Sequence, residues 1–341
     1  MKLLDLHRHW DCSHSVNALT QVAQEYNIDF FQGKDIKSLV VQQKEGDWDS
    51  YYDCLINTRK AYVSLDAIED LSYYTFRDAA NETDGFELRL TLISITDALL
   101  KNQGRDVDTG EFICTAESIL ACIISGKEKA FREDTRKVWS GLRFAFTRRE
   151  QFLHLLEPIA VMIINNYSEF TGLDLLGKED KYTFLPEHQN VIERTREYLP
   201  DLCVHTEMRG LTGVYDALLL NPTTIGHGLN AAEDAAVMNE LVKKNILLEV
   251  TPRSYSYFYD YESKLIKSHL RTMNQHPLVT LQQHGVPFVL GTDIPGNFET
   301  TILQEYAFAE KVGVDMRQVE QDALKRYDCL TAITRNGLNQ R

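Results

Sequence analysis

Histidines and one aspartate recur in this sequence where short apolar segments end. His7 and His9 close the first such segment, and His205, His227 and Asp293 close three later ones. On a β-strand, the spacing of two between His7 and His9 places both imidazoles on the same face. Three imidazoles and a carboxylate can hold Zn²⁺ and leave one coordination position open for water, as in catalytic zinc sites.

A zinc ion held in this way lowers the pKa of its water ligand to ~7 and so supplies hydroxide at neutral pH. The same side chains suit several divalent metals, and we expect one metal per chain, Zn²⁺ or another divalent ion. For any single histidine the alternative is a hydrogen-bonded structural role. The shared placement of all five residues favours the metal site.

The segments that carry these residues are predicted β-strands separated by helical patterns. Eight candidates occur: 3–6, 88–93, 142–146, 172–175, 202–205, 224–227, 246–250 and 288–292. Strand–helix alternation predicts a parallel sheet, and eight strands predict an α/β fold closed as a (β/α)8 TIM barrel. A doubly wound open sheet is the alternative, but no Gly-rich phosphate loop follows any of these strands. Barrel enzymes carry their active sites at the C-terminal strand ends, where these five residues fall.

The 341 residues contain no linker or internal repeat, and we expect a single domain over residues 1–341. The stretch from about 16 to 81 is mostly helical in pattern and predicts extra helices at the barrel mouth, after the first strand.

The chain has 50 acidic and 36 basic residues and a formal net charge of −14. This balance repels phosphate backbones and anionic lipid surfaces, so we expect neither a nucleic acid nor a membrane as partner. The sequence has no long apolar run and no signal-peptide pattern. Its six dispersed cysteines form no CxxC pair and favour reduced thiols, which predicts a cytoplasmic protein. The oligomeric state is left open.

The chain resembles the adenosine deaminase family of metal-dependent amidohydrolases in five segments: DLHRHWDCS (5–13), CVHTEMRG (203–210), TIGHGLNAAED (224–234), LEVTPRSY (248–255) and GVPFVLGTDIPGNF (285–298). These segments keep the family's order, and with GLDLLGKED (172–180) the resemblance covers essentially the whole chain. It implies a (β/α)8 barrel and a zinc-dependent hydrolytic deaminase. The substrate would be an amino-substituted purine, nucleoside or related heterocycle, from which ammonia is released.

The resemblance also implies roles for the matched residues. The zinc ligands would be His7, His9, His205 and Asp293, and Asp293 would also count among the catalytic residues.

Three further roles follow from the same match. His227 would position or deprotonate the attacking water, and Glu207 would protonate a ring nitrogen of the substrate. Asp11 and Gly177 match substrate-side positions, where Gly177 would offer a backbone N–H to the ring.

Two departures from the family pattern concern the chemistry. Glu207 follows His205 by two residues instead of three, so it either reaches the same place through a one-residue deletion or pairs with Arg209. Ile294 stands where the family has a second aspartate that hydrogen-bonds a purine ring nitrogen. Isoleucine cannot make that bond, so adenosine itself is disfavoured as the substrate.

Three arginines are candidates for contact with an anionic group. Arg253 is expected near the barrel mouth as a substrate-binding residue, and Arg148 and Arg149 follow the third predicted strand, where they could contact a phosphate or carboxylate.

Two other functions stay open from the sequence. One is an amidohydrolase that breaks a different bond, such as an amide or ester. The other is a catalytically weak homologue that binds a ligand.

Overall fold

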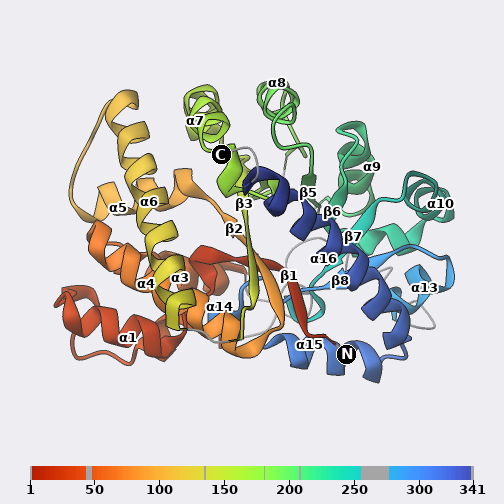
Figure 1. Cartoon of the computed structure of the whole chain (residues 1–341), viewed down its shortest axis with the longest axis horizontal. Coiled ribbons are helices and arrows are strands. Elements are labelled where there is room, and N and C mark those ends of the chain that lie inside the picture. The colour runs from red at the N-terminus through yellow and green to blue at the C-terminus, as the bar shows by residue number, and fades with distance from the viewer. Residues whose placement is uncertain are drawn as a thin grey trace.

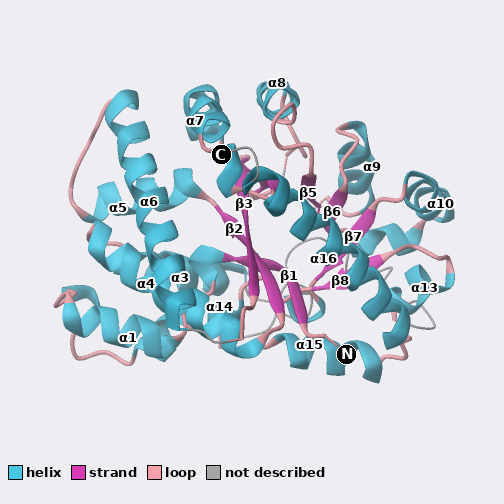
Figure 2. Ribbon diagram, viewed as in Figure 1, coloured by secondary structure: helices cyan, strands magenta, loops and turns pink. Residues whose placement is uncertain are grey.

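Eight parallel strands form one sheet in which each strand pairs with the next along the chain (Figures 1 and 2). The computed structural model describes residues 2–43, 48–133, 136–179, 181–206, 209–254 and 276–338. The strands are β1 (Leu4–His9), β2 (Gly85–Leu90), β3 (Trp139–Thr147), β4 (Gly172–Leu176), β5 (Leu202–Thr206), β6 (Thr224–His227), β7 (Leu247–Val250) and β8 (Phe288–Leu290).

The sheet closes on itself through the segment that follows β8. The backbone N–H of Asp293 donates to the carbonyl oxygen of His7 at 2.8 Å, and the N–H of His9 donates to the carbonyl of Asp293 at 2.7 Å. Gly291 passes β1 so closely that a Cβ there would lie 2.6 Å from the carbonyl oxygen of His7. The prediction of a (β/α)8 barrel is confirmed, and its closing hydrogen bonds fall on three of the residues predicted to bind metal.

One predicted strand was placed too late in the sequence. The segment 88–93 was expected as a strand, but β2 spans Gly85–Leu90 and Ile93 lies in the next helix. Leu92 and Ile93 are buried there, at most 1% exposed. A short apolar run is compatible with either a strand or a buried helix, so periodicity alone did not separate the two.

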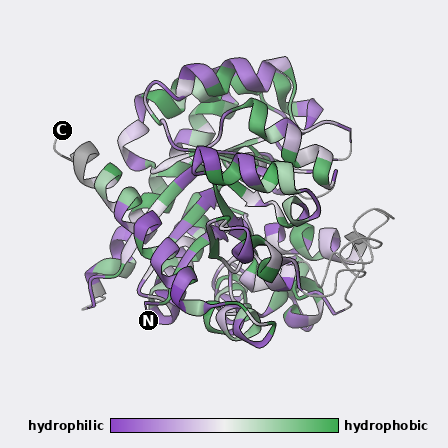
Figure 3. Ribbon diagram, turned by 90° about the vertical axis from the view of Figure 1, so that its right-hand side faces the viewer, coloured by the Kyte–Doolittle hydropathy of each residue, from purple (hydrophilic) through white to green (hydrophobic). Residues whose placement is uncertain are grey.

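Helices surround the barrel (Figure 2) and carry hydrophobic residues on some faces and hydrophilic residues on others (Figure 3). The helices that connect the first three strands are α1 (Val16–Glu25), α2 (Ile36–Val40), α3 (Trp48–Thr58), α4 (Leu65–Glu82), α5 (Leu92–Asn102) and α6 (Thr109–Glu133). Later in the chain come α7 (Leu153–Asn165), α8 (Pro186–Thr195), α9 (Leu211–Leu219), α10 (Ala235–Lys244), α13 (Pro277–Gln283), α14 (Pro295–Phe298), α15 (Ile302–Lys311) and α16 (Met316–Leu338). Helices α1 to α4 occupy the stretch for which extra helices were predicted after the first strand.

Helix α6 is, within the described residues, the one helix long and apolar enough to cross a membrane. Its apolar side packs inside the protein, where Ala116, Ile119 and Ile123 are fully buried. A Cβ on Gly126 would lie 2.6 Å from the Cβ of Ser72 and 2.8 Å from the backbone nitrogen of Tyr73, both in α4. Helix α6 thus packs closely against α4 along this face.

We predict that Gly126→Ala destabilises the protein by about 1–3 kcal/mol, because the added methyl group meets the backbone of α4. Gly110→Ala in the same helix is the matched control, since Gly110 is exposed and its Cβ would contact only Asp108 Oδ1 at 3.3 Å. Urea unfolding of both variants measures the difference. Equal stability of the two variants would contradict the packing described for α6.

Candidate active site

Four imidazoles and one carboxylate converge at the C-terminal ends of β1, β5, β6 and β8. His9 Nε2 lies 3.2 Å from Asp293 Oδ1 and 3.3 Å from His205 Nε2. His7 Nε2 lies 3.8 Å from the same carboxylate oxygen. The ring centroid of His227 is 5.0 Å from that of His7 and 5.1 Å from that of His205. The structure therefore brings together all four residues predicted to bind metal, and His227 with them.

Backbone geometry allows this density of side chains. A Cβ on Gly226 would lie 3.0 Å from His205 Nδ1 and 3.1 Å from His7 Cε1, so the missing side chain leaves room for both rings. His227 and Asp293 both have a φ of +62°, a conformation that residues other than glycine rarely adopt. Such strain typically occurs at functional sites, where the surrounding structure holds it in place.

Buried carboxylates orient two of the ring nitrogens. His7 Nδ1 is 3.1 Å from Glu249 Oε2, and His205 Nδ1 is 2.8 Å from Asp174 Oδ1. The guanidinium of Arg89 donates to both carboxylates, to Asp174 Oδ2 at 2.8 Å and to Glu249 Oε2. A carboxylate on Nδ1 favours the tautomer in which Nε2 carries the lone pair, as in histidines that bind metals.

Hydroxyl groups hold two more of the five side chains. His227 Nδ1 lies 2.9 Å from the hydroxyl of Thr251, and the Ser254 hydroxyl donates to Asp293 Oδ2 at 2.8 Å. Both hydroxyl residues come directly after β7, so the ends of three neighbouring strands fix this half of the site.

Burial favours the neutral form of three imidazoles, those of His7, His205 and His227. Desolvation, with a smaller effect of Arg89, puts the pKa of His7 well below its usual range, and desolvation lowers the pKa of His227 to about 3. Desolvation also lowers the pKa of His205, although Asp174 opposes the shift. For Asp293, burial raises the pKa, but hydrogen bonding to His9 and the charge of His227 outweigh it, so the pKa falls below its usual range. Neutral imidazoles beside an ionised carboxylate are the protonation states that a metal ion requires.

The side chains present fit a metal ion. His7 Nε2 is buried and has no hydrogen-bond partner among the described residues, so its lone pair is available to a ligand. His9 and His205 direct Nε2 atoms at each other across 3.3 Å, an arrangement that a shared cation stabilises. In the described part of the chain, potential ligand atoms lie within 4.8 Å of one another in three sets. Two of them are His7 with His205 and His227, and His7 with His9 and Asp293; the third is Asp174 with Cys203 and His205. Mixed imidazole and carboxylate ligands of this kind suit Zn²⁺.

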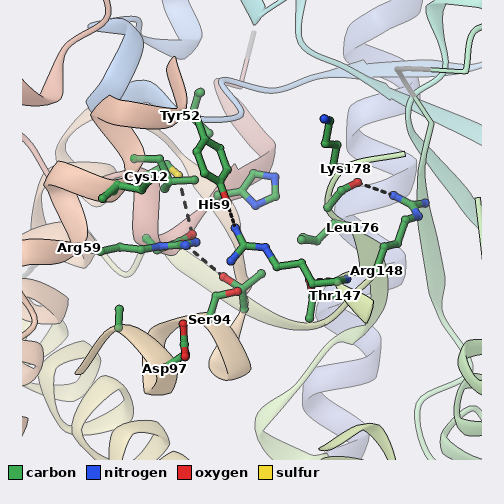
Figure 4. A pocket seen from close by; sticks show the side chains of 18 of the residues that line it. His9, Cys12, Tyr52, Arg59, Ser94, Asp97, Thr147, Arg148, Leu176 and Lys178 are labelled. Carbon is green, nitrogen blue, oxygen red and sulfur yellow. Dashed lines mark hydrogen bonds and ion pairs between the residues drawn. The ribbon is translucent and has the colours of Figure 1, made fainter. Parts of the chain in front are cut away.

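A cavity of about 860 Å³ opens over this cluster and includes His9, His205, His227 and Asp293 in its wall. One side of the cavity comes from helix α3, which contributes Tyr51, Tyr52, Leu55 and Ile56. In Figure 4, Cys12 and Arg59 lie on one side of His9, and Arg148 and Lys178 lie on the other. The extra helices after β1 thus form part of the wall of the candidate active site.

Two predicted substrate-side residues line this cavity. Asp11 accepts a hydrogen bond from Arg59 Nη2 at 2.5 Å and one from the Thr91 hydroxyl at 3.2 Å. Burial raises the pKa of Asp11, but the adjacent Arg59 outweighs burial and leaves the pKa below its usual range. Gly177 directly follows β4 and has a φ of +104°, which favours glycine at that position.

Two other predicted residues are not among the described residues of the cavity wall. The backbone N–H of Arg253 donates to Glu305 Oε2 at 3.0 Å, and Arg253 is not among the described residues that line the cavity. The turn after β7 packs against α15 at this point, so the expected substrate contact of Arg253 has no support in this geometry. Glu207 lies outside the described residues. Its alternative partner Arg209 bonds to Asp216 and to the Thr183 hydroxyl.

Sequence reasoning missed the residues that orient the histidines: Arg89, Asp174, Glu249, Thr251 and Ser254. For three of them the sequence does contain a signal, namely a charged residue between two apolar neighbours within a strand. These are Arg89 in LRL of β2, Asp174 in LDL of β4 and Glu249 in LEV of β7. Each of these three charged residues is fully buried.

Comparison with known proteins agrees with this fold. The model of the adenosine deaminase family matches residues 3–327. An adenosine deaminase from Plasmodium falciparum is 25% identical over 311 residues, which cover 89% of this chain and 77% of that protein. The chain spans about 40% of the length of the first curated relatives that it matches.

Two solved structures share the fold. The N6-methyl-AMP deaminase from Arabidopsis thaliana has a TM-score of 0.70 at 16% identity, covering 99% of this chain and 97% of that one. An amidohydrolase from Burkholderia ambifaria with bound zinc has a TM-score of 0.68 at 16% identity, covering 96% and 84%. With the family match over nearly the whole length, the chain belongs to the adenosine deaminase family of the metal-dependent amidohydrolase superfamily.

Proposed function

We propose that this protein is a zinc-dependent hydrolytic deaminase that removes an amino group from a purine, nucleoside or related heterocycle. The observation that carries the proposal is the convergence of His7, His9, His205 and Asp293, with His227 beside them, in the wall of one cavity. The proposal is also supported by the zinc bound in the Burkholderia amidohydrolase and by the substrate named for the Arabidopsis deaminase.

In this proposal His7, His9, His205 and Asp293 hold the zinc ion. A bound zinc ion supplies Lewis-acid activation of water at neutral pH. Glu249 and Asp174 hold Nδ1 of His7 and His205 and keep their Nε2 lone pairs directed at the centre of the cluster. Asp293 stays ionised and is fixed by Ser254.

His227 serves as the group that orients the attacking water and accepts its proton. Its low pKa leaves the imidazole neutral at pH 7, and the Thr251 hydroxyl fixes Nδ1. A neutral imidazole held in place can act as a general base. Glu207 is proposed as the group that protonates the ring nitrogen, and the backbone N–H of Gly177 as a donor to the ring. Asp11 is proposed as a further polar contact for the substrate.

The wall next to Asp293 favours a substrate other than adenosine. Ile294 lines the cavity, is 2% exposed, and packs with Cys12, Leu55 and Phe298 in an apolar cluster. A ring nitrogen held against this surface would lose its hydrogen bond to water without a replacement, which costs about 1–3 kcal/mol. We therefore propose a heterocycle that presents a nonpolar edge to Ile294.

Zinc affinity should depend on the carboxylates behind the histidines. We predict that Asp174→Asn weakens zinc binding about 10- to 100-fold, because His205 loses the charged partner that orients it. Competition with a chelator measures the affinity. Asp216→Asn is the matched control, since this carboxylate pairs with Arg209 away from the histidines. An unchanged affinity in Asp174→Asn would count against the assigned metal site.

Deaminase activity is tested by ammonia release from zinc-loaded protein. The substrate panel contains adenine, adenosine, AMP, N6-methyl-AMP and aminopyrimidines. We predict that His227→Gln and Glu207→Gln each lower kcat by ~10²–10⁴, because each removes a proton-transfer group. His284→Gln changes an exposed histidine and should have no effect.

Two results would reject the proposed reaction. Products that lack ammonia would indicate an amidohydrolase acting on another bond. Binding without turnover would indicate a ligand-binding homologue.

A further inference from the structure

Several lysine and arginine side chains line the cavity, and carboxylates of the protein neutralise only some of them. Three of them, Arg59, Lys101 and Lys181, have carboxylate partners at 2.5, 2.8 and 3.5 Å. These cations are committed to the protein's own charges and are poor candidates for ligand contact.

Arg148 is also committed, and its predicted contact with a phosphate is not supported. Its guanidinium is buried and donates to three backbone carbonyls, those of Gly177 at 3.0 Å, His205 at 2.6 Å and Thr183 at 2.5 Å. Arg148 therefore ties together the segments that follow β4 and β5, and its Nε, Nη1 and Nη2 each already donate to a backbone carbonyl.

The neighbouring Arg149 is neither fully buried nor bonded through its guanidinium to a backbone carbonyl in the described part of the chain. Among the described residues no carboxylate lies at ion-pair distance from its guanidinium. Its Nη2 donates to the Tyr52 hydroxyl at 2.7 Å. The guanidinium carbon lies 5.7 Å from the centre of the Tyr52 ring. Arg149 is half-buried, lines the cavity, and keeps Nε and Nη1 without a partner in the described part of the chain.

Tyr52 fixes the position of this cation without cancelling its charge. Tyr52 belongs to α3 and Arg149 follows β3, so their contact joins two sides of the cavity wall. Figure 4 shows Tyr52 pointing into the cavity, and the dashed line from its hydroxyl marks the bond to Arg149. A guanidinium held at one N–H by an aromatic hydroxyl can present its remaining N–H groups as a fork, which matches two oxygens of a phosphate or carboxylate.

We infer that Arg149, held by Tyr52, binds an anionic oxygen group of the substrate, a phosphate or a carboxylate. The volume of about 860 Å³ accommodates a heterocycle over the histidines together with such a substituent. The inference rests on the proposed function in that the anion belongs to the substrate. It narrows the substrate class from neutral heterocycles to those that carry an acidic substituent.

The test compares ligands that differ only in charge and are not deaminated: inosine, inosine 5′-monophosphate and inosine 5′-carboxylate. Titration calorimetry with zinc-loaded protein gives the three affinities. We expect at least one anionic compound to bind about 10- to 100-fold more tightly than inosine. Arg149→Met should abolish this gain, and Tyr52→Phe should reduce it, while the affinity for inosine stays the same.

Lys181→Met is the matched control, because Lys181 lines the same cavity but pairs with Glu150. A gain for the monophosphate alone identifies phosphate, and a gain for the carboxylate alone identifies a carboxylate ligand. Equal affinities for all three compounds, or a gain that persists in Arg149→Met, would overturn the inference. A gain that depends on Arg149 without ammonia release from the substrate panel would support the anion site and reject the deaminase function.

Discussion

The candidate site depends on one buried arginine. Arg89 is fully buried in β2, and its guanidinium joins Asp174 to Glu249, the two carboxylates that hold His205 and His7. Despite burial, the charge and hydrogen bond of His205, followed by the charge of Arg89, keep the pKa of Asp174 below its usual range. Removing one partner of a buried ion pair typically costs about 3–5 kcal/mol. Through Arg89, strands β1, β2, β4, β5 and β7 are coupled to the orientation of two imidazoles.

The network continues away from the cavity. Arg143 bonds to Glu87 and Asp201, and Arg326 of α16 bonds to Asp201 and lies 3.6 Å from Glu249. The carboxylates of the network are Glu87, Asp174, Asp201 and Glu249, against the guanidiniums of Arg89, Arg143 and Arg326. Asp293 adds one more negative charge beside the histidines. Within this set of groups the carboxylates outnumber the guanidiniums by two.

The cavity combines two kinds of wall that suit different parts of a ligand. Ile294, Cys12 and Leu55 form an apolar surface beside Asp293, whereas Arg149 presents a cation with no acidic partner in the described residues. Helix α3 contributes to both, through Leu55 and Tyr52. Helix α3, which lies outside the repeating strand–helix pattern of the barrel, thus contributes to the wall of the cavity but contains none of the residues proposed to bind metal.

The sequence by itself determined the barrel and the residues that converge in it. Eight apolar segments alternating with helical patterns specify a parallel barrel, and chemistry-bearing residues at the ends of those segments must meet at one rim. Family motifs added Asp11 and Gly177, which line the cavity. Only the tertiary structure decided which polar groups are already satisfied. Arg148 and Arg149 are adjacent in sequence and identical in type, yet one is bonded to three carbonyls and the other to a single hydroxyl. The partners of Arg89 and of Arg253 also come from segments distant in sequence. Local sequence patterns do not specify such partners.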